Sequence, residues 1–421
     1  MTAQLKEHDR QDPTDTARAE APVFTGIGVT APNGLGTEAW WRATVAGESG
    51  IRPVSRFDAS GYPATLAGEV PGFEVKEHIP SRLVPQTDHM TRLALTAAAE
   101  AIQDAGLDLE QLPEYAAGVV TAASAGGFEF GQRELEALWG KGGQHVSAYQ
   151  SFAWFYAVNS GQISIRHGLR GPSGVLVTEQ AGGLDAVAQA RRQLRKGSQV
   201  MVTGGVDGSI CPWGWTAHLT SGRLSTRDDP ARAYLPFDAD ADGQVPGEGG
   251  AILVLEDAGT ARARGARTYG ALAGYAATFD PAPGVPGEPG LCRAAEMALE
   301  QAGVTPAEVD VVFADGSGVP DQDRLEAEAI TKVFGPGGVA VTVPKTMTGR
   351  LAAGGAPLDL AAALLSVRDG VIPPTVNAGR LADGCDLDLV TEARRLPVRT
   401  ALVLARGYGG FNAAAVVTAA A

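Results

Sequence analysis

The chain has 421 residues, of which 44% are hydrophobic and 55 are glycine, values typical of an α/β protein rather than of a string of small modules. Its 34 basic and 48 acidic residues give a formal net charge of −14 at pH 7. A negative charge of this size works against binding to nucleic acid or to an anionic membrane surface.

The N-terminal residues contain no apolar stretch of the kind found in a signal peptide, and no run of about 18 apolar residues occurs in the sequence. We expect residues 1–21 to form a disordered extension and the protein not to cross a membrane. Cys211, Cys292 and Cys385 are far apart and follow no disulfide or metal-binding spacing. This cysteine usage fits a reducing cytosol, so we expect a cytoplasmic protein without a metal or another cofactor.

Short runs rich in Val, Ile and Leu alternate along the chain with Ala-rich helical segments. The runs are apolar throughout rather than at every second residue, which predicts strands covered by helices on both faces, and therefore an α/β fold. Residues 400–419 predict two strands joined by a Gly-rich turn, so part of the sheet is expected to be antiparallel. The predicted strands lie at 23–29, 117–122, 175–178, 199–204, 251–256, 309–314, 339–343 and 400–405.

The same order of segments occurs twice in the sequence. A helix ended by Gly and followed by a buried strand is found at 97–127 and again at 294–318, and a Val-rich strand running into a turn is found at 174–183 and 339–349. We therefore expect two duplicated α/β/α/β/α halves with mixed sheets. The expected halves are residues 22–256 and 257–421.

In a duplicated α/β fold, the strand ends of the two copies meet at one cleft, where binding and catalytic sites form. The turns that follow the repeated strands should therefore lie side by side. The segments expected to converge are residues 178–183, 314–323, 344–355 and 406–412.

Several motifs together resemble the β-ketoacyl synthases of the thiolase superfamily, from about residue 22 to the C-terminus. These motifs are GIGVTAPNGLG near the start, PFDADADGQVPGEGGAILVLED in the middle, GYGGFNAAAVV at the end, and the turns at 178–183, 314–323 and 344–355. The resemblance implies a thiolase-like fold.

The family resemblance also implies a catalytic cysteine and two histidines, and this chain differs at all three positions. Gln180 stands at the strand-to-helix turn where the cysteine is expected, and an amide cannot act as a nucleophile near neutral pH. Asp315 and Arg350 replace the two histidines, whereas Lys345 is retained. An ionised Asp315 would repel a developing enolate, and Arg350 stays protonated and cannot act as a base. We expect no independent Claisen condensation, and we expect Asp315 and Arg350 to form an ion pair.

TEQAGGLDA, FADGSGVP and PKTMTGR together are similar to the chain-length factors, the β subunits of the ketosynthase heterodimers of bacterial type II aromatic polyketide synthases. This resemblance implies a partner, the catalytic ketosynthase subunit, which retains the cysteine and both histidines. It also implies that an acyl carrier protein delivers malonyl groups, mainly through contacts with that partner. The growing poly-β-ketone is expected to occupy a tunnel at the subunit interface.

Phe128, Gly131 and Leu135 fall on one face of the helix expected within residues 126–142. An ordinary core-facing stripe is one interpretation. The resemblance gives another, in which this helix borders the tunnel and the bulk at these positions sets the length of the polyketide. Because Gly131 and Leu135 are modest in size, a comparatively deep tunnel is expected.

The sequence allows more than one role for Gln180, Cys211 and the aromatic residues that follow. Gln180 could satisfy the amides of its turn, or it could hydrogen-bond the thioester carbonyl in a malonyl-carrier-protein decarboxylase that supplies the acetyl starter. Cys211 could be a relocated nucleophile, although no histidine is near it in the sequence. Aromatic residues concentrated in 152–156 could anchor an interface or pack in the core.

Overall fold

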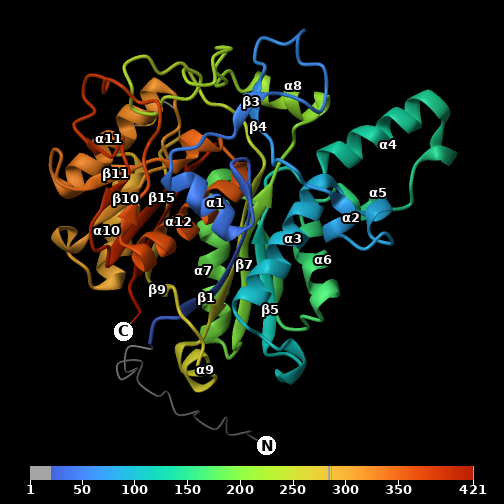
Figure 1. Ribbon diagram of the computed structural model, residues 1–421, viewed down its shortest axis with the longest axis horizontal. Helices are drawn as coiled ribbons and strands as arrows, with labels where there is room; N and C mark the ends of the chain where they lie inside the picture. Colours follow the sequence, from blue (N-terminus) through green and yellow to red (C-terminus); the bar gives the residue numbers. More distant parts are fainter. Residues whose placement is uncertain (1–19, 283–284, 286, 421) are drawn as a thin grey trace, which may run out of the picture.

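The structure is a computed structural model that describes residues 20–282, 285 and 287–420 (Figure 1). In this part of the chain, a mixed twelve-stranded sheet has the order β13-β11-β10-β15-β16-β9-β1-β8-β7-β5-β6, with β2 paired to β1. Two short ribbons, β3 (Ile51–Pro53) with β4 (Leu66–Gly68) and β12 (Val371–Ile372) with β14 (Arg394–Arg395), lie outside it. The strands of the large sheet are β1 (Val23–Ala31), β2 (Gly34–Leu35), β5 (Ala117–Ala122), β6 (Ser173–Leu176), β7 (Val200–Asp207), β8 (Gly249–Glu256), β9 (Gly270–Phe279), β10 (Val311–Phe313), β11 (Ala340–Thr342), β13 (Asp388–Leu389), β15 (Thr400–Gly407) and β16 (Phe411–Thr418).

The order of strands is the same on both sides of the central pair β1 and β9, which run antiparallel with Val23 opposite Ala271. Leading away from this pair, β1-β8-β7-β5-β6 on one side corresponds to β9-β16-β15-β10-β11 on the other. This symmetry fits the duplication seen in the sequence, and we propose Glu256, at the end of β8, as the boundary between the halves. Of the expected extension at 1–21, residues 1–19 lie outside the described residues, and Glu20 pairs with Arg262 at 2.7 Å.

Helices form three layers around the two halves of the sheet (Figure 1). The central layer is α7 and α12, each of which contacts strands of both halves. In α12, 12 of the 15 residues are buried, because GAPLDLAAALLS is apolar on nearly every side. The helices are α1 (Thr37–Val45), α2 (Val75–His78), α3 (His89–Asp104), α4 (Phe128–Lys141), α5 (Gln150–Ala153), α6 (Val158–His167), α7 (Gly182–Arg195), α8 (Pro212–Thr220), α9 (Ala258–Ala263), α10 (Gly290–Ala302), α11 (Pro320–Phe334) and α12 (Gly355–Asp369).

The outer layers are formed by α3 and α6 on one half and by α10 and α11 on the other (Figure 1). Helix α3 begins at the Asp88 N-cap, whose carboxylate accepts a hydrogen bond from the Met90 N–H, and it buries an Ala- and Leu-rich face against β1. Helix α4 differs from all of these because it projects from the body as an arm. The resulting α/β architecture with a mixed sheet is the one predicted.

The predicted strands are present; β5 coincides with the prediction at 117–122, and the others have slightly shifted ends. The predicted strand at 175–178 is β6 at 173–176, and the predicted C-terminal hairpin is confirmed by the antiparallel pairing of β15 and β16 from Thr400 opposite Thr418 to Gly407 opposite Phe411. Strand β9 was not predicted. Its sequence, GALAGYAATF, is dominated by Ala and Gly instead of the β-branched residues that signal a strand. No helix in the described residues is both long enough and apolar enough to cross a membrane.

Candidate functional site

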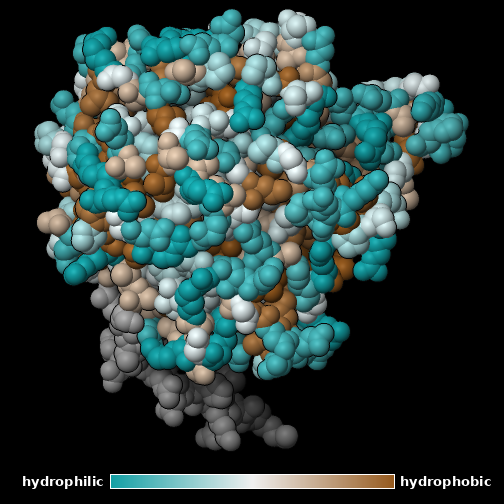
Figure 2. All heavy atoms as spheres, in the orientation of Figure 1, coloured by the Kyte–Doolittle hydropathy of each residue, from teal (hydrophilic) through white to brown (hydrophobic). Residues whose placement is uncertain are grey.

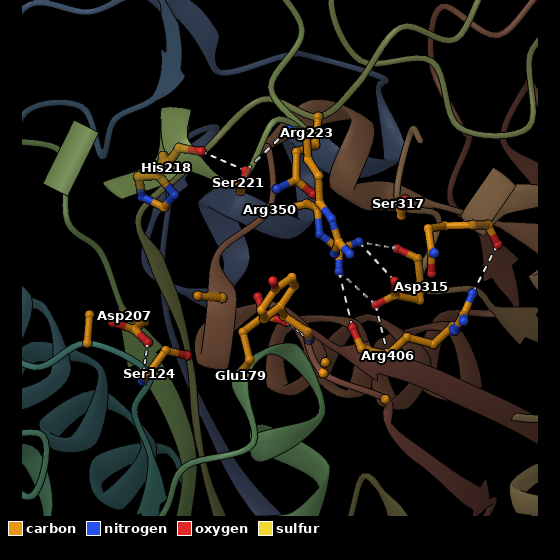
Figure 3. A pocket seen from close by; sticks show the side chains of 18 of the residues that line it. Ser124, Glu179, Asp207, His218, Ser221, Arg223, Asp315, Ser317, Arg350 and Arg406 are labelled. Carbon is orange, nitrogen blue, oxygen red and sulfur yellow. Dashed lines mark hydrogen bonds and ion pairs between the residues drawn. The ribbon is translucent and has the colours of Figure 1, made fainter. Parts of the chain in front are cut away.

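The four segments expected to converge do lie around one cavity of about 600 Å³ at the end of the sheet (Figure 3). They follow β6, β10, β11 and β15, so the strand ends of both halves contribute, as in other open α/β sheets. Residues of these segments that line the cavity are Glu179, Asp315, Ser317, Gln322, Arg350, Ala352 and residues 406–410. The remaining wall includes the loop after β7 and α8, with Ser209 and His218, and residues that follow β5 and β9 or lie between α8 and β8.

Gln180 does not face this cavity. Its side chain is fully buried and lies against Gly355 at the start of α12, where a Cβ atom would stand 2.3 Å from the Gln180 Nε2. Neither the amide nitrogen nor the amide oxygen has a hydrogen-bond partner within the described part of the chain. The amide therefore neither satisfies the turn nor reaches a ligand in the cavity, and its burial carries an uncompensated desolvation cost.

The turn presents Glu179 instead. Glu179 has a φ of 52°, in the left-handed region that a non-glycine residue rarely adopts. Its side chain lines the cavity and accepts a hydrogen bond from the Tyr408 N–H at 2.9 Å. Glu179 was not predicted as a site residue. The turn exposes the residue one position before Gln180, and the backbone angle that causes this shift has no signature in the sequence.

Asp315 and Arg350 form the ion pair expected from their opposite charges (Figure 3). The Arg350 Nη1 donates to the Asp315 Oδ2 at 2.9 Å, and the Asp315 Oδ1 also accepts the Arg406 backbone N–H at 3.1 Å. Both side chains are at least nine-tenths buried. Burial alone would lower the pKa of Arg350, but the Asp315 carboxylate raises it, so the guanidinium stays charged. The pair occupies the floor where the family resemblance placed two imidazoles.

Two carboxylates of α11 support the loop that carries Asp315. Glu326 accepts the backbone N–H groups of Asp315 at 2.7 Å and Gly316 at 2.9 Å, and Asp323 accepts that of Gly318 at 3.0 Å. Burial, followed by the charge of Asp315, raises the pKa of Glu326 to about 7, and burial raises that of Asp323 to about 7. Both were missed because acidic residues on a helix usually face solvent.

Lys345 is buried and holds the fold together behind the cavity. Its Nζ donates to the Ala314 carbonyl oxygen at 2.9 Å and is paired with the Asp359 carboxylate of α12. Burial raises the pKa of Asp359 to about 6, although the ammonium group opposes this change. Lys345 thus ties the end of β10 to the central layer and is not among the residues that line the cavity.

Glu326 predicts a measurable pH dependence of stability. Its folded-state pKa of about 7 lies above the ordinary value of 4.5, so the folded protein binds this proton more tightly than the unfolded chain does. The stability contributed by the proton is therefore fully present below about pH 4.5 and is lost as the pH rises towards 7. We expect the thermal midpoint to fall between about pH 4.5 and 7, and Glu326→Gln to flatten this fall. Glu328→Gln, at an exposed position of the same helix, is the control, and an unchanged slope in Glu326→Gln would contradict the assignment.

The three candidate tunnel residues lie away from this cavity, on the α4 arm. Gly131 is buried, while Phe128 and Leu135 are half-buried. The Trp213 indole of α8 stacks on the Phe128 ring with centroids 4.5 Å apart, and a Cβ atom at Gly131 would stand 3.1 Å from the Trp213 Cζ3. Trp213 was missed, because it is about eighty residues from α4 in the sequence.

The remaining candidates are also placed by the structure. Cys211 is buried, and burial raises the pKa of its thiol to about 11, which disfavours the nucleophilic thiolate. Trp154, Phe155 and Tyr156 are each at least 40% exposed, so they are surface residues and not core residues. Aromatic side chains exposed together are typical of an interface with another protein.

Family models and known relatives match most of the chain. Residues 21–261 match the family model for the β-ketoacyl synthase N-terminal domain, and residues 269–379 match that for the C-terminal domain. Over 403 residues, the chain is 61% identical to the tetracenomycin polyketide synthase ketoacyl synthase beta subunit of Streptomyces glaucescens, covering 95% of this chain and 98% of that one.

Two solved structures are similar over nearly the whole chain. One is described as the ishigamide ketosynthase/chain length factor, with a TM-score of 0.86, 30% identity, and coverage of 96% of this chain and 100% of that chain. The other is AntDE:AntF, described as a type II PKS acyl-carrier protein in complex with its ketosynthase bound to the hexaketide. It has a TM-score of 0.85, 27% identity, and coverage of 96% of this chain and 100% of that chain.

Proposed function

Because this chain belongs to the β-ketoacyl synthase family, as a chain-length factor among the β subunits of polyketide ketosynthases, we propose that it is the non-condensing subunit of a ketosynthase heterodimer. The heterodimer acts in a bacterial type II polyketide synthase that makes aromatic products. The subunit shapes a tunnel at the dimer interface, and the tunnel sets the length of the poly-β-ketone.

The observation that carries this proposal is the buried ion pair of Asp315 and Arg350. Condensation needs a thiolate to hold the growing chain and imidazoles to stabilise the enolate of the extender. At the positions of these three groups the chain has Gln180, Asp315 and Arg350, and the Asp315–Arg350 ion pair, with its charged atoms 2.9 Å apart, occupies the place of the two imidazoles. A subunit of this kind contributes to the heterodimer by binding its partner and by shaping the tunnel. Co-expression with the ketosynthase partner should yield poly-β-ketones from malonyl-carrier protein, and the isolated chain should form no C–C bond.

The open edge of β6 supports dimer formation. This strand ends the sheet. The carbonyl oxygen of Pro172, just before β6, accepts the Val119 N–H of β5, and that of Leu176 accepts the N–H of Ala123, just after β5. Since backbone groups alternate along a strand, Ser173 and Val175 present their N–H and C=O groups outwards, where no described strand pairs with them. An unpaired edge of this kind is a template for a strand of another subunit.

Exposed apolar side chains extend the same surface. Val177, directly after β6, is 45% exposed, and Ile165 of α6, the helix that packs on β6, is 78% exposed. The exposed residues 154–156 lie just before α6 in the chain. Trp139, near the end of α4, is 79% exposed. Figure 2 shows apolar atoms among the hydrophilic ones on the arm and along the flank of the body below it. Apolar exposure on this scale is typical of an obligate interface.

We expect Val175→Pro to weaken the heterodimer about tenfold. Proline removes the outward N–H of β6, and the loss of one backbone hydrogen bond of the interface costs about 1 kcal/mol, to which poorer strand pairing adds. Val175→Ala keeps that N–H and is the matched control. The dissociation constant of the purified pair, measured by titration, checks the effect. If the two variants bind alike, β6 is not the pairing strand.

We assign the docking of the acyl carrier protein mainly to the catalytic partner. The net charge of −14 disfavours an acidic carrier protein on this subunit, and a related solved complex contains an acyl-carrier protein together with its ketosynthase. The buried free thiols fit the cytoplasmic location that belongs to the same proposal. The decarboxylase alternative receives no support from the geometry, because the buried Gln180 amide does not line the cavity.

A further inference from the structure

A serine and a histidine are hydrogen-bonded to each other on the wall of the cavity. Ser209 follows β7, and His218 lies in the last turn of α8. The Ser209 Oγ and the His218 Nε2 are 2.9 Å apart, and both side chains line the cavity. In Figure 3, His218 lies across the cavity from Asp315 and Arg406, so this pair is separate from the ion pair on the floor.

The geometry is that of a nucleophile with its base. A distance of about 2.6 to 3.2 Å between a hydroxyl and an imidazole nitrogen allows direct proton transfer. With the proton of the ring on Nδ1, the Nε2 accepts the hydrogen bond from the serine hydroxyl. Burial lowers the pKa of His218 to about 4, so the ring is neutral at physiological pH and its Nε2 lone pair is free to accept the hydrogen bond of the serine hydroxyl. The Trp215 ring packs edge-on to the imidazole, with the ring centroids 6.3 Å apart.

The same cavity holds groups that can bind a polarised carbonyl. Arg223 lies with its guanidinium carbon 4.7 Å from the centre of the Tyr408 ring, and no carboxylate of the described residues forms an ion pair with it. Gln244 lines the cavity as well. A guanidinium without a carboxylate partner stabilises negative charge that develops on a carbonyl oxygen. A volume of about 600 Å³ accommodates a small acyl thioester.

We propose that Ser209 is an acyl-accepting nucleophile and His218 its general base, with a small acyl thioester as the donor. The Ser209 Oγ attacks the thioester carbonyl carbon while the His218 Nε2 takes the hydroxyl proton. The tetrahedral intermediate then collapses: the C–S bond breaks, the proton passes from His218 to the sulfur, and a free thiol leaves. An acetyl or similar group remains as an ester on Ser209, without any change of oxidation state.

The test uses the purified heterodimer and the N-acetylcysteamine thioester of acetate as the probe. We expect one acetyl group on this chain, located at Ser209 by peptide mass spectrometry, and none on this chain in Ser209→Ala, whatever the cysteine of the ketosynthase partner carries. His218→Gln should slow acetylation about a hundredfold, the lower end of the usual contribution of a general base. Ser317→Ala is the matched control, because Ser317 lines the same cavity without an imidazole partner, and it should be acetylated like the wild type.

The pH profile gives a second readout. Because His218 is neutral throughout pH 6 to 8, acetylation assisted by it should proceed at a nearly constant rate over this range. Attack assisted by hydroxide would instead rise about tenfold per pH unit. Acetyl groups on lysines or on Ser317 but not on Ser209, no acetylation, or an undiminished rate in a folded His218→Gln protein would overturn the proposal.

Discussion

Asp315→Ala is expected to destabilise the protein by about 3–5 kcal/mol, because it leaves the Arg350 guanidinium buried without its counter-charge. Asp315→Ala combined with Arg350→Met should recover most of this loss, since methionine fills the volume without a charge. The recovery should stay incomplete. Asp315 also accepts the Arg406 N–H at 3.1 Å, and a buried unpaired N–H costs about 1–3 kcal/mol.

Denaturant unfolding of the heterodimer at one fixed concentration measures these differences, because subunit binding contributes to the apparent stability. Asp388→Ala is the control. Asp388 pairs with Arg394 at 2.6 Å, but both side chains are about 40% exposed, so its removal should cost less than about 1 kcal/mol. If the single and double variants at Asp315 and Arg350 lose the same stability, the two charges are not coupled, and the ion pair does not explain why both histidines could be replaced.

The contrast between this pair and Gln180 shows what the sequence could predict about the site. Opposite charges at two loop positions of a duplicated fold predict contact, because the loops must meet at the strand ends. The direction of Gln180 depends on one backbone dihedral angle, the φ of 52° at Glu179, which turns the amide towards Gly355. A single torsion angle of this kind produces no periodic pattern in the sequence. That the Glu179 side chain lines the cavity was therefore evident only from the structure.

The fold followed from the sequence where composition and periodicity agree. The apolar sequences of β7 and β8 and their alternation with Ala-rich helices predict buried strands, and the repeat predicts the symmetry about β1 and β9. Strand β9 was not predicted, because its Ala and Gly residues have low strand propensity. Its strand conformation is favoured by close packing against α10. That contact is tertiary, so local propensity does not predict it.

Trp213 is the other feature that only tertiary structure reveals, and it changes the expectation for the tunnel. Gly131 and Leu135 alone predict open space beside α4. In the structure, the Trp213 indole covers Gly131 and stacks on Phe128, so the bulk that α4 lacks is supplied by α8. We therefore propose that the free length of a tunnel along α4 depends on Trp213 as much as on the residues of α4.

Trp213→Ala in the heterodimer should make longer poly-β-ketones the main products, because removal of the indole opens the space over Gly131. Mass spectrometry of the extracted products measures the length distribution. Gly131→Trp should have the opposite effect and shorten the products, since even its Cβ atom would stand 3.1 Å from Trp213. Tyr115→Ala removes another large aromatic side chain, 67% exposed and before β5, and should leave the distribution unchanged. Unaltered product lengths in a stably assembled Trp213→Ala heterodimer would mean that the polyketide does not extend along this face of α4. Phe128, Gly131 and Leu135 would then pack the α4 arm without determining the length of the product.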